Sequence, residues 1–374
     1  MARERFMDRA RGLAERGRYT AAPNPLVGSV VVWDGEVVGE GWHARAGGDH
    51  AEVAALKANG SSASGATMYV TLEPCNHHGR TPPCTDAIVD AGIERLVVGH
   101  LDPDPRMRGK SVEILRHAGL EVEVLDDGLF ERQNEQFFHY MRTGRPFVHL
   151  KLAASLDGRI ATRTRDSRWV TGEAARQRAH LLRAEAGAVL VGVGTVRADD
   201  PLLTARGLPD TPPAMTRVVL DPRLTTSAES RLARTAHESP VLIFAEEASL
   251  DGREHALAER GVEVVTVPRS GGGLDLGSVL DELGRRGIKG LFVEGGGETA
   301  SGFVAAGLVD KMTVFYAPKL LGPEGVPMIG GPLSPGLVAD APRFSVSGVE
   351  QVGEDVEITF YPENREEEHV HGTG

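Results

Sequence analysis

Residues 67–99 read TMYVTLEPCNHHGRTPPCTDAIVDAGIERLVVG, and this stretch decides the fold of the first half of the chain. Its apolar pattern predicts a strand over 67–71, a helix over 82–91 that ends at Gly92, and a second strand over 95–99. A strand, a helix and a strand in this order form a βαβ unit, in which the helix covers a parallel pair of strands. We therefore expect an α/β domain.

The residues before this unit add two strands and two helices. GSVVVWD (28–34) and EVVGE (36–40) predict a hairpin around Asp34-Gly35, which is a favoured turn dipeptide. A helix is expected over 49–58. The N-terminal residues predict an amphipathic helix with four inward apolar side chains, Phe6, Met7, Ala10 and Leu13.

A second α/β domain is expected after the polar segment RTGRP at 142–146, which resembles a linker. Helices are expected over 171–186, with Thr171 as the N-cap, and over 275–286. Strands are predicted by the apolar segments FVHLKLAAS, AVLVGV, RVVLD, PVLIF, VEVVTV, GLFVEG, MTVFYAP and VEITFYP. The 374 residues fit two domains, 1–143 and 144–362, followed by a tail over 363–374 that is expected to be disordered.

Composition limits the function classes. The net charge of −12 argues against a general nucleic-acid binder, because phosphate-backbone affinity needs clustered Lys and Arg. No segment has the roughly 18 to 20 consecutive apolar residues of a membrane helix. The N-terminus lacks the apolar core of a signal peptide, and two cysteines are weak evidence of secretion. We expect a cytoplasmic protein with no membrane partner.

Four residues form a pattern typical of a catalytic zinc site. His50 and Glu52 begin a predicted helix, Cys75 follows a predicted strand, and Cys84 opens the next helix behind two prolines. One imidazole and two thiolates leave the fourth tetrahedral position of Zn²⁺ open for water. Glu52 is the wrong residue type for a soft ligand, but it is placed to move a proton from that water to a leaving amine. H-x-E…P-C-x-x-C is the signature of zinc deaminases.

Two other interpretations of these residues stay open. His77 or His78 would supply a fourth ligand if the zinc were structural, and the two cysteines would be unligated if no metal binds. Eight residues separate Cys75 from Cys84, a longer spacing than the P-C-x-x-C of other zinc deaminases.

The sequence around the two cysteines, with this longer spacing, resembles one protein family. The run GWHARAGGDHAEVAAL…YVTLEPCNHHGRTPPCTDAI, preceded by TAAPNPLVGSVVV, resembles the deaminase domain of the bifunctional riboflavin-biosynthesis proteins. The resemblance implies a cytidine-deaminase-like three-layer α/β/α domain that removes the 2-amino group of 2,5-diamino-6-ribosylamino-4(3H)-pyrimidinone 5′-phosphate. It implies that ring and phosphate are held by Asn24, His43, Arg80 and Asp102. Asp104, in DPDP, stands where the family usually has Asn.

The second half carries VEGGGETA between a predicted strand and a helix. Such a turn is suited to a pyrophosphate at a helix N-terminus, although by itself it is also an ordinary tight βα turn. KLAASLDGRIA, SRWVTG, GVGTVRADDPLLTAR and VEGGGETA…DKMTVFYAPKLLG resemble, in order, the reductase domain of the same family. The resemblance implies a dihydrofolate-reductase-like α/β fold that uses NADPH to reduce the ribosyl group of 5-amino-6-(5-phosphoribosylamino)uracil to ribityl.

The same resemblance implies the ligand contacts of this domain. The NADPH contacts are Ala154, Trp169, Thr195, Asp199, Gly296, Gly297, Glu298, Thr299, Ala300, Ser301 and Gly302. The substrate contacts are Ser167, Arg183, Leu203, Arg206 and Glu294. Arg183 and Arg206 are fork-shaped cations suited to a phosphate ester, although either is also compatible with an ordinary surface position. Lys151 either stabilises charge at the sugar or lies at a strand edge, and Pro222 removes a backbone donor near the expected cofactor.

Three rival functions predict different features. A nucleic-acid-editing deaminase needs a basic face and stacking aromatics, whereas only five per cent of this chain is aromatic. A zinc-stabilised binding protein has no use for Glu52 and leaves the second half unexplained. A fusion that retains one activity would have lost part of a motif, yet His50, Glu52, Cys75 and Cys84 are all present. We expect a bifunctional enzyme that binds a small phosphorylated pyrimidine and forms a homo-oligomer.

Overall fold

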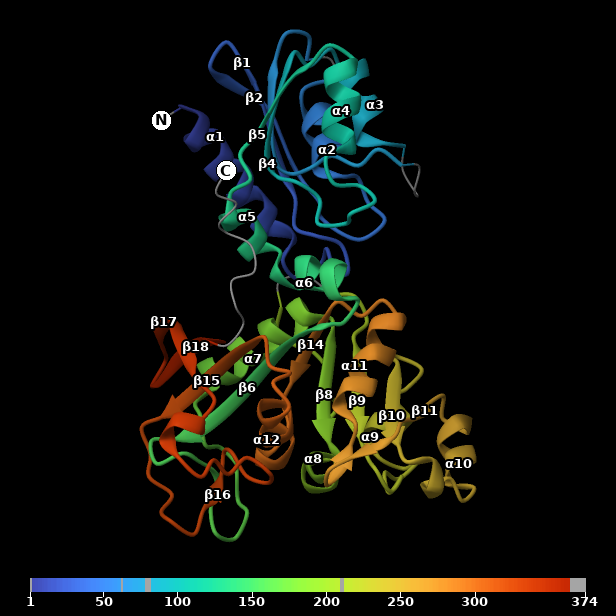
Figure 1. Cartoon of the computed structure of the whole chain (residues 1–374), viewed down its shortest axis with the longest axis vertical. Coiled ribbons are helices and arrows are strands. Elements are labelled where there is room, and N and C mark those ends of the chain that lie inside the picture. Colours follow the sequence, from blue (N-terminus) through green and yellow to red (C-terminus); the bar gives the residue numbers. More distant parts are fainter. Residues whose placement is uncertain (1, 62, 78–81, 209–211, 364–374) are drawn as a thin grey trace. The chain divides into compact units, whose positions relative to one another are not determined.

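The computed structural model describes residues 2–61, 63–77, 82–208 and 212–363. The chain forms two compact units that divide between Gly144 and Arg145 (Figure 1). The expected tail lies outside the described residues except for Glu363. No helix in the described part of the chain combines the length and hydropathy that a membrane span requires.

The first unit is a five-stranded sheet in the order β2-β1-β3-β4-β5. β1 pairs antiparallel with β2 and β3, whereas β3, β4 and β5 run parallel. The strands are β1 (Gly28–Trp33), β2 (Glu36–Trp42), β3 (Thr67–Leu72), β4 (Arg95–His100) and β5 (Glu121–Val124). The helices are α1 (Ala2–Ala14), η1 (Glu15–Gly17), α2 (Ala51–Ala58), α3 (Cys84–Asp90), α4 (Lys110–His117), α5 (Gly128–Gln133) and α6 (Glu135–Thr143).

Helices cover both faces of this sheet, because neighbouring residues of a strand point to opposite faces. Val31 and Met68 pack in the core that α2, α3 and α4 complete. Val30 and Val32 pack instead against α1, whose four predicted inward side chains are all buried. α5 adds Phe130 beside Val97 on that same face. The expected three-layer α/β/α arrangement is confirmed (Figure 1).

The second unit contains a nine-stranded sheet in the order β11-β10-β9-β8-β14-β6-β15-β18-β17. β18 pairs antiparallel with both β15 and β17, and the other neighbouring strands are parallel. Its main strands are β6 (Phe147–Ser155), β8 (Ala188–Gly192), β9 (Thr216–Leu220), β10 (Val241–Ala245), β11 (Glu263–Thr266), β14 (Gly290–Val293), β15 (Lys311–Ala317), β17 (Phe344–Val352) and β18 (Asp355–Pro362). Two short hairpins are separate, β7 (Arg159–Ala161) with β16 (Val326–Pro327) and β12 (Arg269–Ser270) with β13 (Gly273–Leu274).

Helices again pack on both faces. α11 and α12 cover the face that carries Leu150 and Val293, whereas α7 covers the opposite face beside Phe292. The helices are α7 (Glu173–Ala186), α8 (Val193–Asp199), α9 (Arg231–Arg234), η2 (Glu247–Ser249), α10 (Arg253–Glu259), α11 (Leu276–Arg285), α12 (Gly297–Ala305) and η3 (Val338–Asp340). The mixed α/β class expected from the sequence is confirmed.

One local prediction is wrong. α7 begins after Gly172 and not after Thr171. The Gly172 amide donates to the Asp355 carboxylate at 2.7 Å, so a side chain from the distant strand β18 takes the place of a local cap. Thr171 is buried, and its carbonyl accepts a hydrogen bond from Arg176.

Glycines let α2 approach β2 closely. A Cβ atom built on Gly41 would lie 2.3 Å from the carbonyl oxygen of Ala51, and one on Gly39 would lie 2.4 Å from that of Ala55. These contacts are with backbone, which cannot rotate away as a flexible side chain can. The position of α2 therefore depends on the absence of side chains at both glycines.

We predict that Gly41→Ala lowers the free energy of unfolding of the first unit by about 1–3 kcal/mol, the usual cost of overpacking. Denaturant unfolding measures this loss. Gly12→Ala is the matched control, because a Cβ there meets nothing within 4 Å and α1 gains about 0.5–1 kcal/mol from the exchange. A Gly41→Ala variant as stable as the parent protein would contradict the close approach.

Candidate active sites

Three potential metal ligands meet in the first unit. His50 is the N-cap of α2, Cys84 is the first residue of α3, and Cys75 follows β3. Pro83 precedes α3 as its N-cap, so the two prolines end the preceding loop and place Cys84 in the first helical turn. Three separate elements thus bring one imidazole and two thiols to one place.

The spacing of the donor atoms fits a zinc ion. His50 Nδ1 lies 3.2 Å from Cys84 Sγ and 3.4 Å from Cys75 Sγ, and the three donor atoms lie within 4.8 Å of one another. Zn–S bonds of about 2.3 Å and Zn–N bonds of about 2.0–2.1 Å place such ligands about 3.5 Å apart in a tetrahedron. Among the residues that the structure describes, no fourth donor belongs to this group. His77 is exposed and lies outside it, and His78 falls outside the described residues.

The titratable groups of this site differ from their free forms. Burial raises the pKa of Glu52 to about 7. Hydrogen bonds from Cys84 and His50 lower the pKa of Cys75 to about 4, against the opposing effect of burial. Cys75 therefore favours its thiolate, the form that binds metal. A carboxyl group with a pKa near neutrality both takes up and releases protons readily.

Asn24 and His43 adjoin the metal ligands. Asn24 Nδ2 lies 3.0 Å from His43 Nε2, and His43 Nδ1 lies 3.0 Å from the carbonyl oxygen of Asp49. The His43 ring meets the His50 ring edge to face, with centroids 5.5 Å apart. Both candidate substrate residues therefore belong to the wall around the metal ligands. Arg80 falls outside the described residues.

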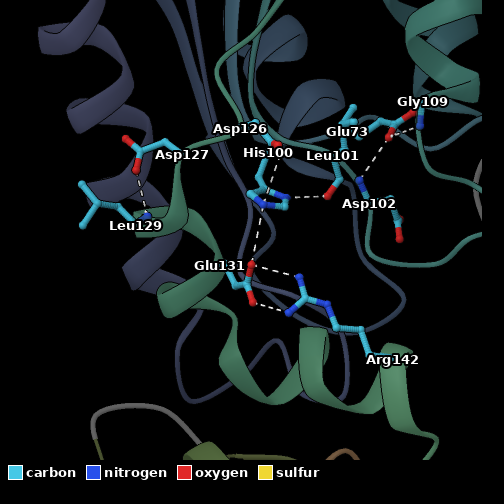
Figure 2. Close-up of polar contacts among 10 residues, drawn as sticks. All are labelled: Glu73, His100, Leu101, Asp102, Gly109, Asp126, Asp127, Leu129, Glu131 and Arg142. Carbon is cyan, nitrogen blue, oxygen red and sulfur yellow. Dashed lines mark hydrogen bonds and ion pairs between the residues drawn. The ribbon is translucent and has the colours of Figure 1, made fainter. Parts of the chain in front are cut away.

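Asp102 lies in the loop that follows β4, beside the end of β3. Its backbone amide donates to Glu73 (Figure 2). Its carboxylate accepts the Asp104 amide at 2.8 Å. Asp104 in turn holds Arg106, with 2.7 Å between Oδ2 and Nη2. Arg106 lowers the pKa of the Asp104 carboxyl group, which favours its charged form.

A second polar cluster forms in the other unit, where Lys151, Arg183 and Glu294 lie on the sheet face that α7 covers. Arg183 Nε and Nη2 donate to the two Glu294 oxygens at 2.5 and 2.7 Å, and Nη1 donates to the Thr204 carbonyl at 3.0 Å. Arg183 thus binds a carboxylate in this structure. Burial lowers the pKa of Lys151. Burial also opposes the ionised form of Glu294, but Arg183 keeps its pKa below the ordinary value.

The turn between β14 and α12 is open at Gly296. A Cβ there would meet nothing within 4 Å, whereas one on Gly297 would lie 2.6 Å from the carbonyl oxygen of Pro327. The amides of Gly297, Glu298 and Thr299 form the first helical turn, where no intrahelical carbonyl is available to them. This open turn fits a pyrophosphate of a dinucleotide. The remaining residues of the turn already have partners within the protein. The Ala300 amide donates to the Gly296 carbonyl, buried Ser301 accepts the Leu333 amide, and Gly302 faces Leu276.

The other expected cofactor contacts vary in exposure. Trp169 is 64% exposed, with the Arg176 guanidinium 4.5 Å from its ring centroid. Ala154 is fully buried within β6. Thr195 is half-buried on α8, and Asp199 ends that helix and accepts a hydrogen bond from Arg168 at 3.5 Å.

The other expected substrate contacts also differ. Ser167 is half-buried, and its carbonyl accepts the Val170 amide. The Leu203 side chain belongs to the hydrophobic core, so any ligand contact there is left to its backbone. Arg206 is exposed. Pro222 accepts hydrogen bonds at its carbonyl from Glu246 and Ser249.

Sequence reasoning missed two polar residues beside these sites. Glu73 is buried and accepts three backbone hydrogen bonds. His180 lies one turn before Arg183 on α7, and its Nδ1 is buried without a hydrogen-bond partner. Burial, and then Arg183 and Arg206, lower the pKa of His180. The signal for His180 was its spacing of three from Arg183, which places both on one helix face.

Comparisons with known proteins identify the family of each half of the chain. Residues 1–100 match the cytidine and deoxycytidylate deaminase zinc-binding region, and residues 146–358 match the RibD C-terminal domain. The riboflavin biosynthesis protein RibD of Aquifex aeolicus (strain VF5) is 44% identical over 359 residues, which cover 95% of this chain and 97% of that protein. RibD of Escherichia coli (strain K12) is 42% identical over 373 residues, with 95% and 98% covered.

Two solved structures are similar over nearly the whole chain. RibD of Acinetobacter baumannii, form 1, has a TM-score of 0.88 at 38% identity, covering 96% of this chain and 99% of that chain. The diaminohydroxyphosphoribosylaminopyrimidine deaminase/5-amino-6-(5-phosphoribosylamino)uracil reductase of Thermotoga maritima has a TM-score of 0.84 at 38% identity, with the same coverage. The two folds and their sites define an enzyme that joins a zinc-binding deaminase domain to a reductase domain. The chain belongs to the RibD family of bifunctional riboflavin biosynthesis proteins.

The three-donor site predicts about one zinc ion per chain, with one coordination position left open. Elemental analysis of the purified protein measures the content, and X-ray absorption measures the ligand set. Cys84→Ser should lose most of the zinc, because a hydroxyl group is a poor replacement for a thiolate ligand. His77→Ala is the matched control and should retain it. A fourth protein ligand, or full zinc content in Cys84→Ser, would contradict the open site.

Proposed function

We propose that the chain deaminates 2,5-diamino-6-ribosylamino-4(3H)-pyrimidinone 5′-phosphate hydrolytically. It then reduces 5-amino-6-(5-phosphoribosylamino)uracil to its ribityl form with NADPH. The observation that carries the proposal is the buried carboxyl group of Glu52 beside the donor set of His50, Cys75 and Cys84. The names of the Thermotoga maritima protein support the same two substrates.

We assign the deamination to residues 1–143. A zinc ion held by His50, Cys75 and Cys84 would acidify a water molecule for attack on the ring. Glu52 takes up the proton of the attacking water and delivers it to the departing 2-amino group, which leaves as ammonia. A pKa near 7 suits both halves of this transfer. Asn24 and His43 bind the pyrimidine from one side of the site, Asp102 binds it from its loop, and Arg80 binds the phosphate.

We assign the reduction to residues 144–362. NADPH supplies the hydride. The open turn at Gly296 and the first amides of α12 bind its pyrophosphate, and the contacts implied by family resemblance line the rest of its site. Lys151 stabilises charge at the sugar and is the group in its cluster with a proton to give, because burial lowers its pKa. Glu294 and Arg183 hold each other in place beside it.

Arg206 is the proposed phosphate ligand in this domain. Arg183 is bound to Glu294, whereas Arg206 is exposed in the loop that carries Leu203. Ser167 and the Leu203 backbone complete the substrate contacts. These assignments follow the family pattern residue by residue.

We further propose a cytoplasmic homo-oligomer. Cys75 and Cys84 form no disulfide, and metal binding requires reduced cysteines, a state that a reducing compartment maintains. The outermost strand β17 supports an oligomer, because Val346 and Val349 on it are 61% and 62% exposed.

Glu52→Gln tests the proposed deamination. The substitution keeps the size of the side chain and removes its basicity, so ammonia release from the diaminopyrimidine phosphate should fall by about a hundredfold or more. Zinc content should stay normal, because Glu52 is not a ligand. The same variant should oxidise NADPH at the parent rate when given the deaminated pyrimidine.

Lys151→Ala is the converse variant, which should impair NADPH oxidation while ammonia release continues. Loss of both reactions in a folded, zinc-loaded Glu52→Gln protein would contradict two independent sites. Ammonia release at the parent rate would remove Glu52 from the proposed mechanism.

Arg206→Ala tests the phosphate contact. Loss of a hydrogen bond to a charged group costs about 1.5–3 kcal/mol, so the KM for the ribosylaminouracil phosphate should rise by roughly ten- to a hundredfold. Ammonia release should not change. An equal loss with the dephosphorylated substrate would show that Arg206 does not bind the phosphate.

A further inference from the structure

Glu73 is a buried carboxylate that holds the two ends of a loop. Its side chain accepts the amides of Asp102 and Gly109 on Oε2, at 3.0 and 2.9 Å, and the amide of Ser111 on Oε1, at 3.0 Å. Glu73 is 6% exposed, and Figure 2 shows it reaching Asp102 and Gly109 from the end of β3. One carboxylate therefore satisfies three backbone donors that lie far from it in sequence.

Two of these donors belong to the beginning of α4. Gly109 is the N-cap of that helix and has no side chain to accept a hydrogen bond from the first turn. Glu73 takes over that function from another strand, and its charge is favourable at a helix N-terminus. The third donor, Asp102, opens the loop that leads to this helix. The loop is thus closed at both ends by one side chain.

The loop is also braced internally. The Asp104 amide donates to the Asp102 carboxylate, and the Asp104 carbonyl accepts the Met107 amide at 2.8 Å. Glu73 N donates to the His100 carbonyl at 2.9 Å, which joins the ends of β3 and β4. Because Cys75 follows Glu73 by two residues, one short segment carries both a metal ligand and the anchor of the Asp102 loop.

We propose that Glu73 is a positioning residue for the deamination, which fixes the loop 102–109 beside the metal-ligand segment so that Asp102 meets the substrate. Glu73 itself touches neither substrate nor metal. The inference rests on the proposed deaminase function and on the assignment of Asp102 to the substrate.

The test is Glu73→Gln in the full-length, zinc-loaded protein. The amide keeps its oxygen as the acceptor for Ser111 but turns an NH₂ group toward the Asp102 and Gly109 amides, so both ends of the loop lose their acceptor. The KM for the diaminopyrimidine phosphate should rise about tenfold or more, as for the loss of hydrogen bonds to a charged group, while kcat falls much less. NADPH oxidation with the deaminated pyrimidine should be unchanged. Glu73→Asp keeps the charge on a shorter side chain, so its KM for the diaminopyrimidine phosphate should lie between those of the parent protein and Glu73→Gln.

Asp127→Ala is the matched control. Asp127 caps α5, a different helix, by accepting the Leu129 amide at 2.9 Å (Figure 2). Its loss should lower the thermal midpoint and leave the KM unchanged. A parent KM in folded Glu73→Gln, or an equal rise in KM in Asp127→Ala, would overturn the proposal.

Hydrogen exchange gives a measurement that does not depend on activity. The amides of Asp102, Gly109 and Ser111 should be protected in the parent protein, and those of Asp102 and Gly109 should exchange faster in Glu73→Gln. Unprotected exchange of all three amides in the parent protein would contradict the anchoring of the loop by Glu73, even if Glu73→Gln failed to fold. If the parent protein released no ammonia, the proposed deaminase function would be wrong. Protected amides in the same protein would show that Glu73 still anchors the loop, so the two failures are distinguishable.

Discussion

The close contact between α2 and β2 is the constraint on which the deaminase site depends. Gly39 and Gly41 let the backbone of the helix lie against the strand, and Ala51 and Ala55 are fully buried at that contact. His50 caps this helix, so its distance to the cysteines is set by how deeply the helix packs. A metal ion would add a second constraint, because its ligands join α2, α3 and the end of β3. Packing of the helix and metal binding therefore favour the same arrangement of the donors.

The parts of the fold that sequence predicts well are those with local causes. Asp34 and Gly35 both have positive φ, 48° and 79°, as the tight hairpin turn between β1 and β2 requires, and the dipeptide predicts this turn. The start of α7 was not predictable, because Gly172 is bound by a carboxylate 183 residues away. β17 was also missed. It is the outermost strand, and its mostly exposed residues lack the apolar alternation that marks a strand buried on one face.

The same distinction holds for the sites. His50, Glu52 and the two cysteines follow from residue type and spacing, because the chemistry of zinc restricts both. Glu73 did not follow, because its hydrogen bonds reach amides 29 to 38 residues away and exist only once β3 and β4 lie side by side. The partner of Arg183 was likewise hidden. Sequence suggested a phosphate, whereas the packing of α7 against β14 brings Glu294 to the guanidinium.

Two glutamates show how the environment divides one residue type between two tasks. Glu52 and Glu294 are both removed from water, which opposes the charged form of each. Glu294 is held ionised by the bidentate Arg183, whereas burial outweighs every opposing contact of Glu52 and raises its pKa to about 7. A carboxylate paired with arginine keeps its charge and suits the fixed framework of a substrate site. A carboxyl group left near neutrality exchanges protons instead. Under the proposed function, Glu52 moves a proton in the deaminase domain, whereas Glu294 holds Arg183 in place in the reductase domain.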